Sequence, residues 1–132
     1  MPIRLDEGGL RSRILVVDDS EAVRRGFERA INEQSDLEVC GEATNGVECI
    51  ARAQELRPDA VLLDISTPVM NGLDAARQLR ELMPSLPVVI CSSFDGPSLE
   101  REAQMVGAKG VVSKAQPVER LIECIRSVVR LP

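Results

Sequence analysis

Residues Asp59 to Gly72 read DAVLLDISTPVMNG, an apolar run that ends on a carboxylate. A run of this length, bounded by turn residues, is typical of a buried β-strand. Pro68 and Gly72 lie behind the run and indicate a turn that leads into the next element. Because a strand that is stabilised by burial gains nothing from a charge at its tip, Asp64 is a candidate functional residue.

The same unit, an apolar run followed by a helical pattern, occurs five times along the chain. The five runs are ILVVDDS (14–20), LEVCGEA (37–43), DAVLLD (59–64), LPVVICSS (86–93) and GVVSK (110–114). Behind each run, apolar residues recur at the spacing expected for one face of an amphipathic helix. These helix positions are Val23, Phe27, Ala30 and Ile31; Val47, Ile50, Ala51 and Leu56; Leu73, Ala76, Leu79 and Leu82; Leu99, Ala103 and Val106; and Val118, Leu121, Ile122, Ile125, Val128 and Val129.

Five strands that alternate with five helices predict an α/β fold, a doubly wound five-stranded parallel sheet with helices on both faces. The 132 residues, 44% hydrophobic and 28% charged, fit a single globular domain. We expect residues 1–12 to form a loose leader without regular structure, and residues 13–132 to form the domain. Functional groups in such sheets gather outside the carboxyl ends of the strands.

The composition excludes several kinds of function. The chain has no histidine, which excludes a histidine base, a histidine metal ligand and a phosphohistidine within it. A net charge of −5, with two phenylalanines as the only aromatic residues, argues against direct binding of nucleic acid. No apolar segment approaches the ~20 residues of a membrane helix, and the amino terminus lacks a secretion signal, so we expect a cytoplasmic protein without membrane contact. The four cysteines show no CxxC spacing, which favours reduced thiols in the core.

The expected strand tips carry an unusual set of polar residues. Asp18 and Asp19 follow the first strand, Asp64 ends the third, Ser92 ends the fourth and Lys114 ends the fifth. Each residue alone also suits a helix cap, a turn or a solvated surface. Together the three carboxylates repel one another by roughly 3 kcal/mol per pair at ~5 Å, so a cation is required nearby. Mg²⁺ and a lysine suit this need, and the set predicts phosphoryl transfer to a carboxylate, with Asp64 as the nucleophile.

The motifs VVDDS, LLDISTPVMNG, VVICSS and GAKGVVSK have the order and spacing of a known family. From about Arg13 to its end, the chain resembles the receiver domain of bacterial two-component response regulators. EVCGEATNG and MPSLPVVI are most similar to the receivers of NarL-type transcriptional regulators. The resemblance implies the flavodoxin-like strand order 2-1-3-4-5, for which CheY is a general example.

The resemblance also implies a set of site residues and partners. Asp64 is then the phosphoacceptor, and Mg²⁺ (or Mn²⁺) is bound by Asp18, Asp19, Asp64 and the backbone carbonyl of Ser66. Lys114 binds the phosphoryl group, and Ser92 is the switch hydroxyl. The donor is a sensor histidine kinase or a histidine phosphotransfer protein, and the output is an effector domain, a downstream protein or a phosphorylation-dependent homodimer. The chain is then not an enzyme but a phosphoacceptor switch that catalyses its own phosphorylation and dephosphorylation.

Three positions depart from the family pattern. Thr67 replaces a usual methionine, a loop exchange from which we expect little change, and Ala115 follows Lys114 where many members have proline. Val111 stands where the family has an aromatic residue that moves inward with the switch hydroxyl. This exchange raises a second hypothesis, a phosphate-insensitive, receiver-like binding module. A third, a phosphohydrolase of the haloacid-dehalogenase type, requires D-x-D-x-[TV], and DISTP has Ser66 at the second aspartate. The sequence leaves open whether the chain is a stand-alone receiver or part of a longer regulator.

Overall fold

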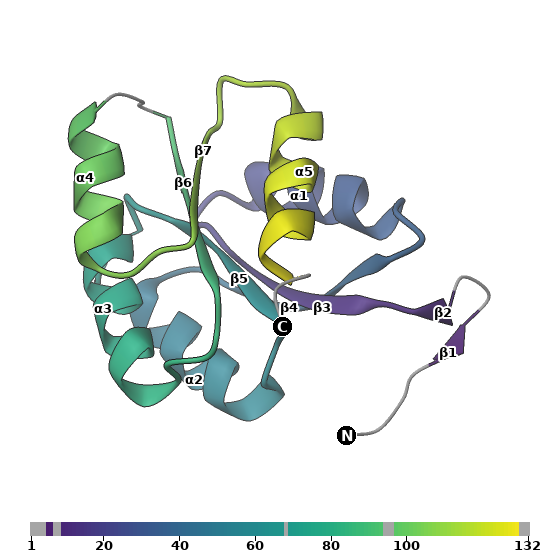
Figure 1. Ribbon diagram of the computed structural model, residues 1–132, viewed down its shortest axis with the longest axis horizontal. Coiled ribbons are helices and arrows are strands. Elements are labelled where there is room, and N and C mark those ends of the chain that lie inside the picture. The colour runs from purple at the N-terminus through teal and green to yellow at the C-terminus, as the bar shows by residue number, and fades with distance from the viewer. Residues whose placement is uncertain (1–4, 7–8, 68, 94–96, 130–132) are drawn as a thin grey trace.

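The computed structural model describes residues 5–6, 9–67, 69–93 and 97–129. Its centre is a five-stranded sheet in the order β4-β3-β5-β6-β7, and every neighbouring pair in this sheet is parallel (Figure 1). The strands are β3 (Ser12–Val17), β4 (Leu37–Ala43), β5 (Ala60–Asp64), β6 (Val88–Ser92) and β7 (Gly110–Ser113). When the five strands of this sheet are numbered 1 to 5 in chain order, starting with β3, their spatial order is 2-1-3-4-5. The predicted fold class and strand order are therefore confirmed.

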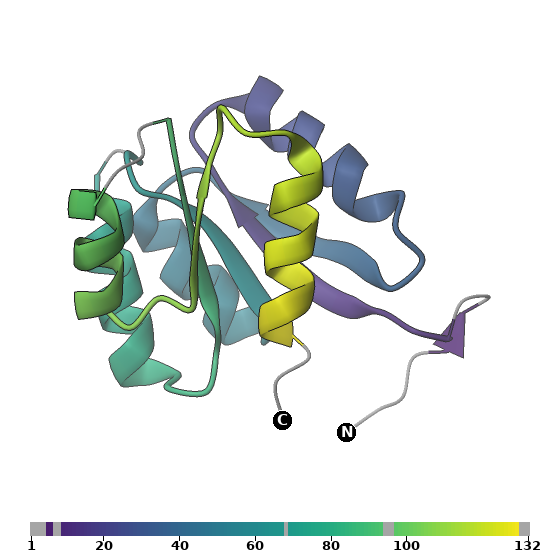
Figure 2. The same ribbon diagram turned by 45° about the horizontal axis from the view of Figure 1, so that its top comes forward.

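Five helices cover the two faces of this sheet. They are α1 (Glu21–Asn32), α2 (Gly46–Leu56), α3 (Gly72–Leu82), α4 (Pro97–Met105) and α5 (Val118–Val129). Helices α2, α3 and α4 pack on one face and α1 and α5 on the other (Figures 1 and 2). Successive residues of β3 alternate between the two cores, Leu15 and Val17 toward the first, Ile14 and Val16 toward the second. Both faces are therefore buried, which explains why the central strands β3, β5 and β6 read as continuous apolar runs.

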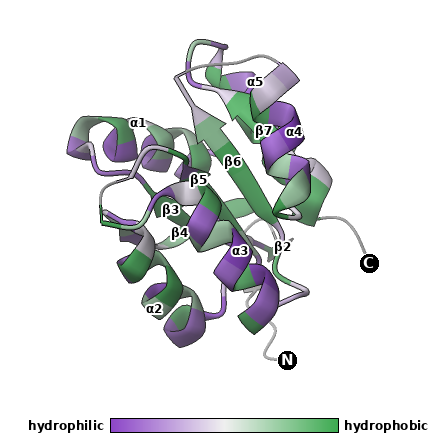
Figure 3. Cartoon of the chain, turned by 90° about the vertical axis from the view of Figure 1, so that its left-hand side faces the viewer, coloured by the Kyte–Doolittle hydropathy of each residue, from purple (hydrophilic) through white to green (hydrophobic). Residues whose placement is uncertain are grey.

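The outer surfaces of the helices are mostly polar, although Val47, Leu82, Met105 and Val118 are exposed apolar residues. Figure 3 shows β6 as hydrophobic along its length, whereas α3 and α4 carry hydrophilic residues on the faces turned toward the viewer. Within the described part of the chain, no helix combines the length and apolar character needed to cross a membrane.

All four cysteines are thiols; Cys49 and Cys91 are buried, and Cys40 and Cys124 are half-buried.

Polar side chains cap the first three helices. Ser20 and Asn45 follow closely on β3 and β4, and Asn71 ends the loop that follows β5. Ser20 accepts a hydrogen bond from the Val23 amide at 3.3 Å. Asn45 and Asn71 do the same for α2 and α3, at 2.8 and 2.9 Å. These bonds satisfy amides that have no partner inside the helix, and they fix the connections at the carboxyl edge of the sheet.

The expectation that residues 1–12 lack regular structure was wrong in part. Two short strands, β1 (Leu5–Asp6) and β2 (Gly9–Leu10), form an antiparallel pair, and β3 begins at Ser12. A ladder of two residues on each side is too short to show apolar alternation, so the sequence pattern does not reveal it. The division of the chain at residue 13 stays a prediction.

The expected inward face of α2 was wrong in part, because Ile50 and Leu56 pack against the core but Val47 and Ala51 are exposed. Val47 is 50% exposed, while Cys49 and Ala53 are fully buried. The helix lies close to β4 at Gly41, where an added Cβ would meet Leu56 Cδ1 at 2.5 Å. The small residues Cys49 and Ala53 therefore occupy the fully buried positions of this face. In α5, four of the six predicted residues, Leu121, Ile122, Ile125 and Val128, are buried. Val129 is partly buried against the same core, and Val118 is 39% exposed.

Candidate functional site

The structure brings the polar strand tips together at one edge of the sheet, as predicted. Asp18 directly follows β3, Asp64 ends β5, Ser92 ends β6 and Lys114 directly follows β7. Parallel strands place their carboxyl ends on the same side, and the four tips belong to adjacent strands. The site is therefore assembled from the backbone topology itself.

Three carboxylates form the acidic part of the site. Asp18, Asp19 and Asp64 each offer an oxygen that lies within 4.8 Å of the others. Asp18 and Asp64 are only 1% and 2% exposed, whereas Asp19 is exposed at the rim. Clustered carboxylate oxygens are the donor set that a hard divalent cation such as Mg²⁺ prefers, so the residues present fit such an ion.

Lys114 contributes the positive charge of the site. Its Nζ lies 2.7 Å from Asp18 Oδ2 and 3.4 Å from Asp64 Oδ2, and its amide donates to the Ser92 carbonyl at 2.7 Å. Burial, the largest single influence, acts to lower the pKa of Lys114. The hydrogen bond to Asp18 and the charges of Asp64 and Asp18 outweigh burial and raise this pKa above its ordinary value. The ammonium therefore stays protonated and bridges two carboxylates.

The loop after β5 closes around Asp64. The amide and hydroxyl of Ser66 donate to Asp64 Oδ1, both at 3.3 Å, and the Ile65 amide donates to the Cys91 carbonyl at 3.0 Å. Gly72 approaches this turn closely, since an added Cβ would lie 2.6 Å from Ile65 Cα and against the Asp64 carbonyl oxygen. The chain thus holds Asp64 by backbone contacts on both sides of its loop.

Sequence reasoning missed what Thr67 does in this loop. Its side chain is buried, and its hydroxyl donates to the Met70 carbonyl at 2.8 Å. The same carbonyl accepts from the Gly46 amide at 3.1 Å, which joins the loop to the start of α2. A methionine at position 67 has no hydroxyl for this bond, so the exchange is less neutral than we expected. Val69 in the same loop has a positive φ of 69° and is 83% exposed.

Arg24 of α1 is the other residue that the sequence did not reveal. It is only 8% exposed, and its Nη1 donates to the Asp18 carbonyl at 2.8 Å. Its Nε lies 2.6 Å from Glu42 Oε1, near the end of β4. An arginine that follows the Asp-Asp pair in a helix reads as a surface charge, and only its place beside two apolar helix positions, Val23 and Phe27, hints at burial.

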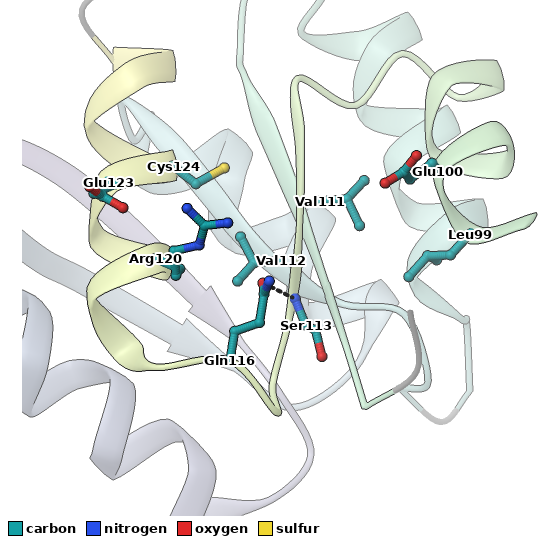
Figure 4. Close-up of a pocket in the computed structure, with 9 residues that line it drawn as sticks. All are labelled: Leu99, Glu100, Val111, Val112, Ser113, Gln116, Arg120, Glu123 and Cys124. Carbon is teal, nitrogen blue, oxygen red and sulfur yellow. Dashed lines mark hydrogen bonds between the residues drawn. The ribbon is translucent and has the colours of Figure 1, made fainter. Parts of the chain in front are cut away.

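The two expected switch positions lie on neighbouring strands. Ser92 is 2% exposed and pairs in register with Ser113. Val111 packs against the core on the side of α4 and lines a pocket of about 700 Å³ between α4, β7 and α5 (Figure 4). Glu100 of α4 and Arg120 of α5 lie at the sides of this pocket. The bond that joins Lys114 to Ala115 is trans, because the described residues contain no cis peptide.

The comparison with protein families agrees with this architecture. The response regulator receiver domain matches residues 14–126 of this sequence, and the chain belongs to this family. It is thus a receiver domain of two-component signalling, a class of signalling switches. Membership removes support from the haloacid-dehalogenase alternative, whose aspartate motif this chain also lacks.

Individual relatives point to the same family. The chain is similar to the chemotaxis protein CheY of Thermotoga maritima, 35% identical over 116 residues, which are 88% of this chain and 96% of that protein. It is 37% identical over 117 residues to the oxygen regulatory protein NreC of Staphylococcus epidermidis, covering 88% of this chain but only 54% of NreC. The chain therefore spans about half the length of several regulators that it matches.

Solved structures give the same result. The response regulator domain of Thermotoga maritima CheB superposes with a TM-score of 0.85 at 31% identity, over 92% of this chain and 98% of that domain. The receiver domain of a putative response regulator NarL from Mycobacterium tuberculosis gives a TM-score of 0.87 at 26% identity, again over 92% and 98%. The predicted family is confirmed, including its likeness to NarL-type receivers.

Proposed function

We propose that the chain is a phosphoacceptor switch in which Asp64 takes a phosphoryl group from a phosphohistidine. The donor is a sensor histidine kinase or a histidine phosphotransfer protein, and Mg²⁺ or Mn²⁺ assists the transfer. The observation that supports this most directly is the position of the Asp64 carboxylate, 3.4 Å from the Lys114 ammonium and beside Asp18 and Asp19. We place this reaction in the cytoplasm, where the phosphohistidine of the kinase or phosphotransfer protein would be formed.

In the proposed reaction, one oxygen of Asp64 attacks the donor phosphorus while the bond from phosphorus to the histidine nitrogen breaks. The imidazole leaves with the electron pair of that bond and takes up a proton. The carboxylates of Asp18, Asp19 and Asp64 and the carbonyl of Ser66 would hold the metal ion. When bound, the ion supplies positive charge that offsets the phosphoryl oxygens and the carboxylates. Lys114 remains with Asp18 and turns its Asp64 contact toward a phosphoryl oxygen.

The proposed switch follows from the new oxygens at Asp64. Ser92 lies at the end of the adjacent strand, and its hydroxyl is a donor that can turn toward a phosphoryl oxygen. In this chain Val111 takes the place of the aromatic residue that usually follows the hydroxyl. The aspartyl phosphate then shifts an equilibrium between two conformations of the domain. Because valine is smaller than an aromatic residue, the side chain at position 111 moves less during this shift.

The output acts either on an effector domain of the same protein or on a separate downstream protein. The first arrangement is suggested by the longer regulators such as NreC, and the second by CheY, which has nearly the length of this chain. A phosphorylation-dependent homodimer is a further form of output for either arrangement.

The chemistry is tested by the intact mass of the protein after incubation with phosphoramidate or acetyl phosphate, with and without Mg²⁺. We expect a gain of one phosphoryl group that requires Mg²⁺ and is absent from Asp64→Asn. Asp74→Asn is the matched control, because Asp74 is an exposed aspartate of α3 paired with Arg77, and this variant should be phosphorylated like the wild type. No gain with either small donor, and none with a cognate kinase, would contradict the proposal.

Val111 favours one second candidate, a binding module that ignores the phosphate. A partner that binds equally well with and without a phosphoryl mimic such as beryllium fluoride, while Asp64 is still phosphorylated, would favour this module over the switch.

A further inference from the structure

Arg24 is a buried cation that no step of the proposed reaction uses. Burying a guanidinium is costly unless its donors are paired, and an apolar side chain fills the same space without that cost. Here the group makes two charge-assisted hydrogen bonds, to the Asp18 carbonyl at 2.8 Å and to Glu42 at 2.6 Å. The acceptors belong to a carboxylate-bearing strand tip and to the adjacent strand β4, which suggests a role at the acidic site.

Asp18 is held at four points, and they differ in what happens to them when a cation binds. Its carboxylate accepts from the Ser20 amide at 2.9 Å and from Lys114 at 2.7 Å. A metal ion competes for these same oxygens. Its backbone donates to the Ala43 carbonyl at 3.1 Å and accepts from Arg24 at 2.8 Å. The two backbone bonds use no carboxylate oxygen, so they persist both with and without a bound cation. They therefore set the direction in which the Asp18 carboxylate points.

We propose that Arg24 is a positioning residue for the divalent cation: by joining the Asp18 carbonyl to Glu42, it holds the Asp18 carboxylate in the orientation that binds metal. The inference rests on the proposed function, since it assumes that Asp18 is a metal ligand. Partners of metal ligands commonly fix ligand orientation, and their loss typically lowers metal affinity by about 10- to 100-fold.

The sign of the effect separates positioning from simple electrostatics. A cation close to three carboxylates repels a divalent ion, so a purely electrostatic Arg24 weakens metal binding, and its removal tightens binding. A positioning Arg24 does the opposite, because its removal frees the Asp18 backbone. Arg24→Met keeps much of the side-chain volume and removes both hydrogen bonds and the charge, so the direction of change decides between the two.

Arg25 offers a matched control in the next position of the same helix. Its side chain is 58% exposed and pairs with Glu28 at 3.1 Å and with Glu42 at 3.7 Å. It shares the Glu42 partner, but its ion pairs with the described residues are all to glutamates. Arg25→Met therefore removes the same charge from the same helix without releasing the Asp18 carbonyl.

The test is a titration of the ¹⁵N-labelled protein with Mg²⁺, followed through the amide signals of Asp19 and Ser20, and a parallel Mn²⁺ titration by electron paramagnetic resonance. We expect Arg24→Met to bind about 10-fold more weakly than the wild type and Arg25→Met to stay within about two-fold. Arg24→Lys, whose single ammonium reaches one acceptor at a time, should be intermediate, and it carries the test if Arg24→Met does not fold. Thermal unfolding reports the fold of each variant.

A second readout excludes a merely structural effect. If Arg24 acts on metal affinity, saturating Mg²⁺ restores the phosphorylation rate of Arg24→Met to that of the wild type, whereas a damaged fold stays slow. Equal affinities for Arg24→Met and Arg25→Met, or tighter binding by Arg24→Met, overturn the positioning role while the wild type still binds metal. Absence of Mg²⁺ binding by the wild type overturns the proposed function itself, and this inference with it.

Discussion

The Nζ atom of Lys114 lies 2.7 Å from Oδ2 of Asp18. This contact gives the site an internal cation in its resting state. Three clustered carboxylates and one ammonium leave two negative charges without compensation, which is the charge of one divalent cation. This charge balance supports the proposed binding of a divalent ion, which would leave Lys114 available to a phosphoryl oxygen.

Replacing Lys114 by methionine should have opposite effects on metal binding and on stability. Without the ammonium the carboxylates attract Mg²⁺ several-fold more strongly, while the metal-free protein loses about 3 kcal/mol because Asp18 and Asp64 are left as buried charges. Urea unfolding with and without Mg²⁺, together with a metal titration, measures both effects. Lys109→Met is the control, because Lys109 is the other lysine of the chain and is exposed. Weaker Mg²⁺ binding by Lys114→Met would show that the ammonium orders the ligands rather than competing with the ion.

Gly72 should not tolerate even a methyl group. An added Cβ meets backbone atoms of Asp64 and Ile65, which cannot move away as a flexible side chain can. We expect Gly72→Ala to destabilise the protein by about 2 kcal/mol and to slow phosphorylation of Asp64. The control is Gly26→Ala in α1, where an added Cβ meets nothing within 4 Å and should stabilise the helix by about 0.5 kcal/mol. Denaturant unfolding and intact-mass kinetics test both variants, and equal stability for the two would contradict the close approach at Gly72.

The fold and the strand-edge residues were predictable because their signals are local. Each apolar run marks a strand, and a parallel topology alone places Asp18, Asp64, Ser92 and Lys114 at one edge. The short strands β1 and β2 and the buried positions Cys49 and Ala53 of α2 were not predictable, since they depend on backbone pairing and on how closely α2 approaches Gly41.

The roles of Arg24 and Thr67 beside the site could not be predicted from the sequence for a different reason. A buried Arg24 and a surface arginine have the same sequence signal, and only packing against Asp18 and Glu42 tells them apart. The hydroxyl of Thr67 likewise acquires its function from the turn that brings Met70 within 2.8 Å. The sequence thus identified the charged side chains of the site. The structure identified Arg24 and Thr67, whose side chains bond to the backbone carbonyls of Asp18 and Met70.

The buried cysteines should respond to pH and to labelling in a defined way. Burial raises the pKa of Cys49 and of Cys91 to about 12, from an ordinary value of 9.0. In the unfolded chain these thiols ionise above pH 9, whereas in the folded chain they stay protonated up to about pH 12. Stability is therefore unaffected by them below pH 9 and falls as pH rises between these two values.

Thiol labelling at pH 8 checks this assignment directly. We expect an alkylating reagent to modify the half-buried Cys40 and Cys124 in the native protein and to leave Cys49 and Cys91 unmodified. In urea all four should react, which serves as the control. Rapid native labelling of Cys91, identified by peptide mass, would mean that the strand edge beside Asp64 opens far more often than its burial implies.

Val111 provides a test of how the site communicates with the rest of the domain. The pocket of about 700 Å³ that Val111 lines has room for a larger side chain between α4 and α5. We expect Val111→Phe to fold stably and to extend the response to beryllium fluoride and Mg²⁺, because a ring that moves with Ser92 displaces neighbours that a valine does not reach. Amide chemical shifts measure this: in the wild type they should change mainly around Asp64 and Ser92, and in the variant also along α4 and α5.

Val47→Phe, on the 50% exposed valine of α2, controls for adding an aromatic ring elsewhere. If the wild type already shifts α4 and α5 as strongly as Val111→Phe, an aromatic residue at this position is unnecessary, and the valine transmits the phosphorylation signal by itself.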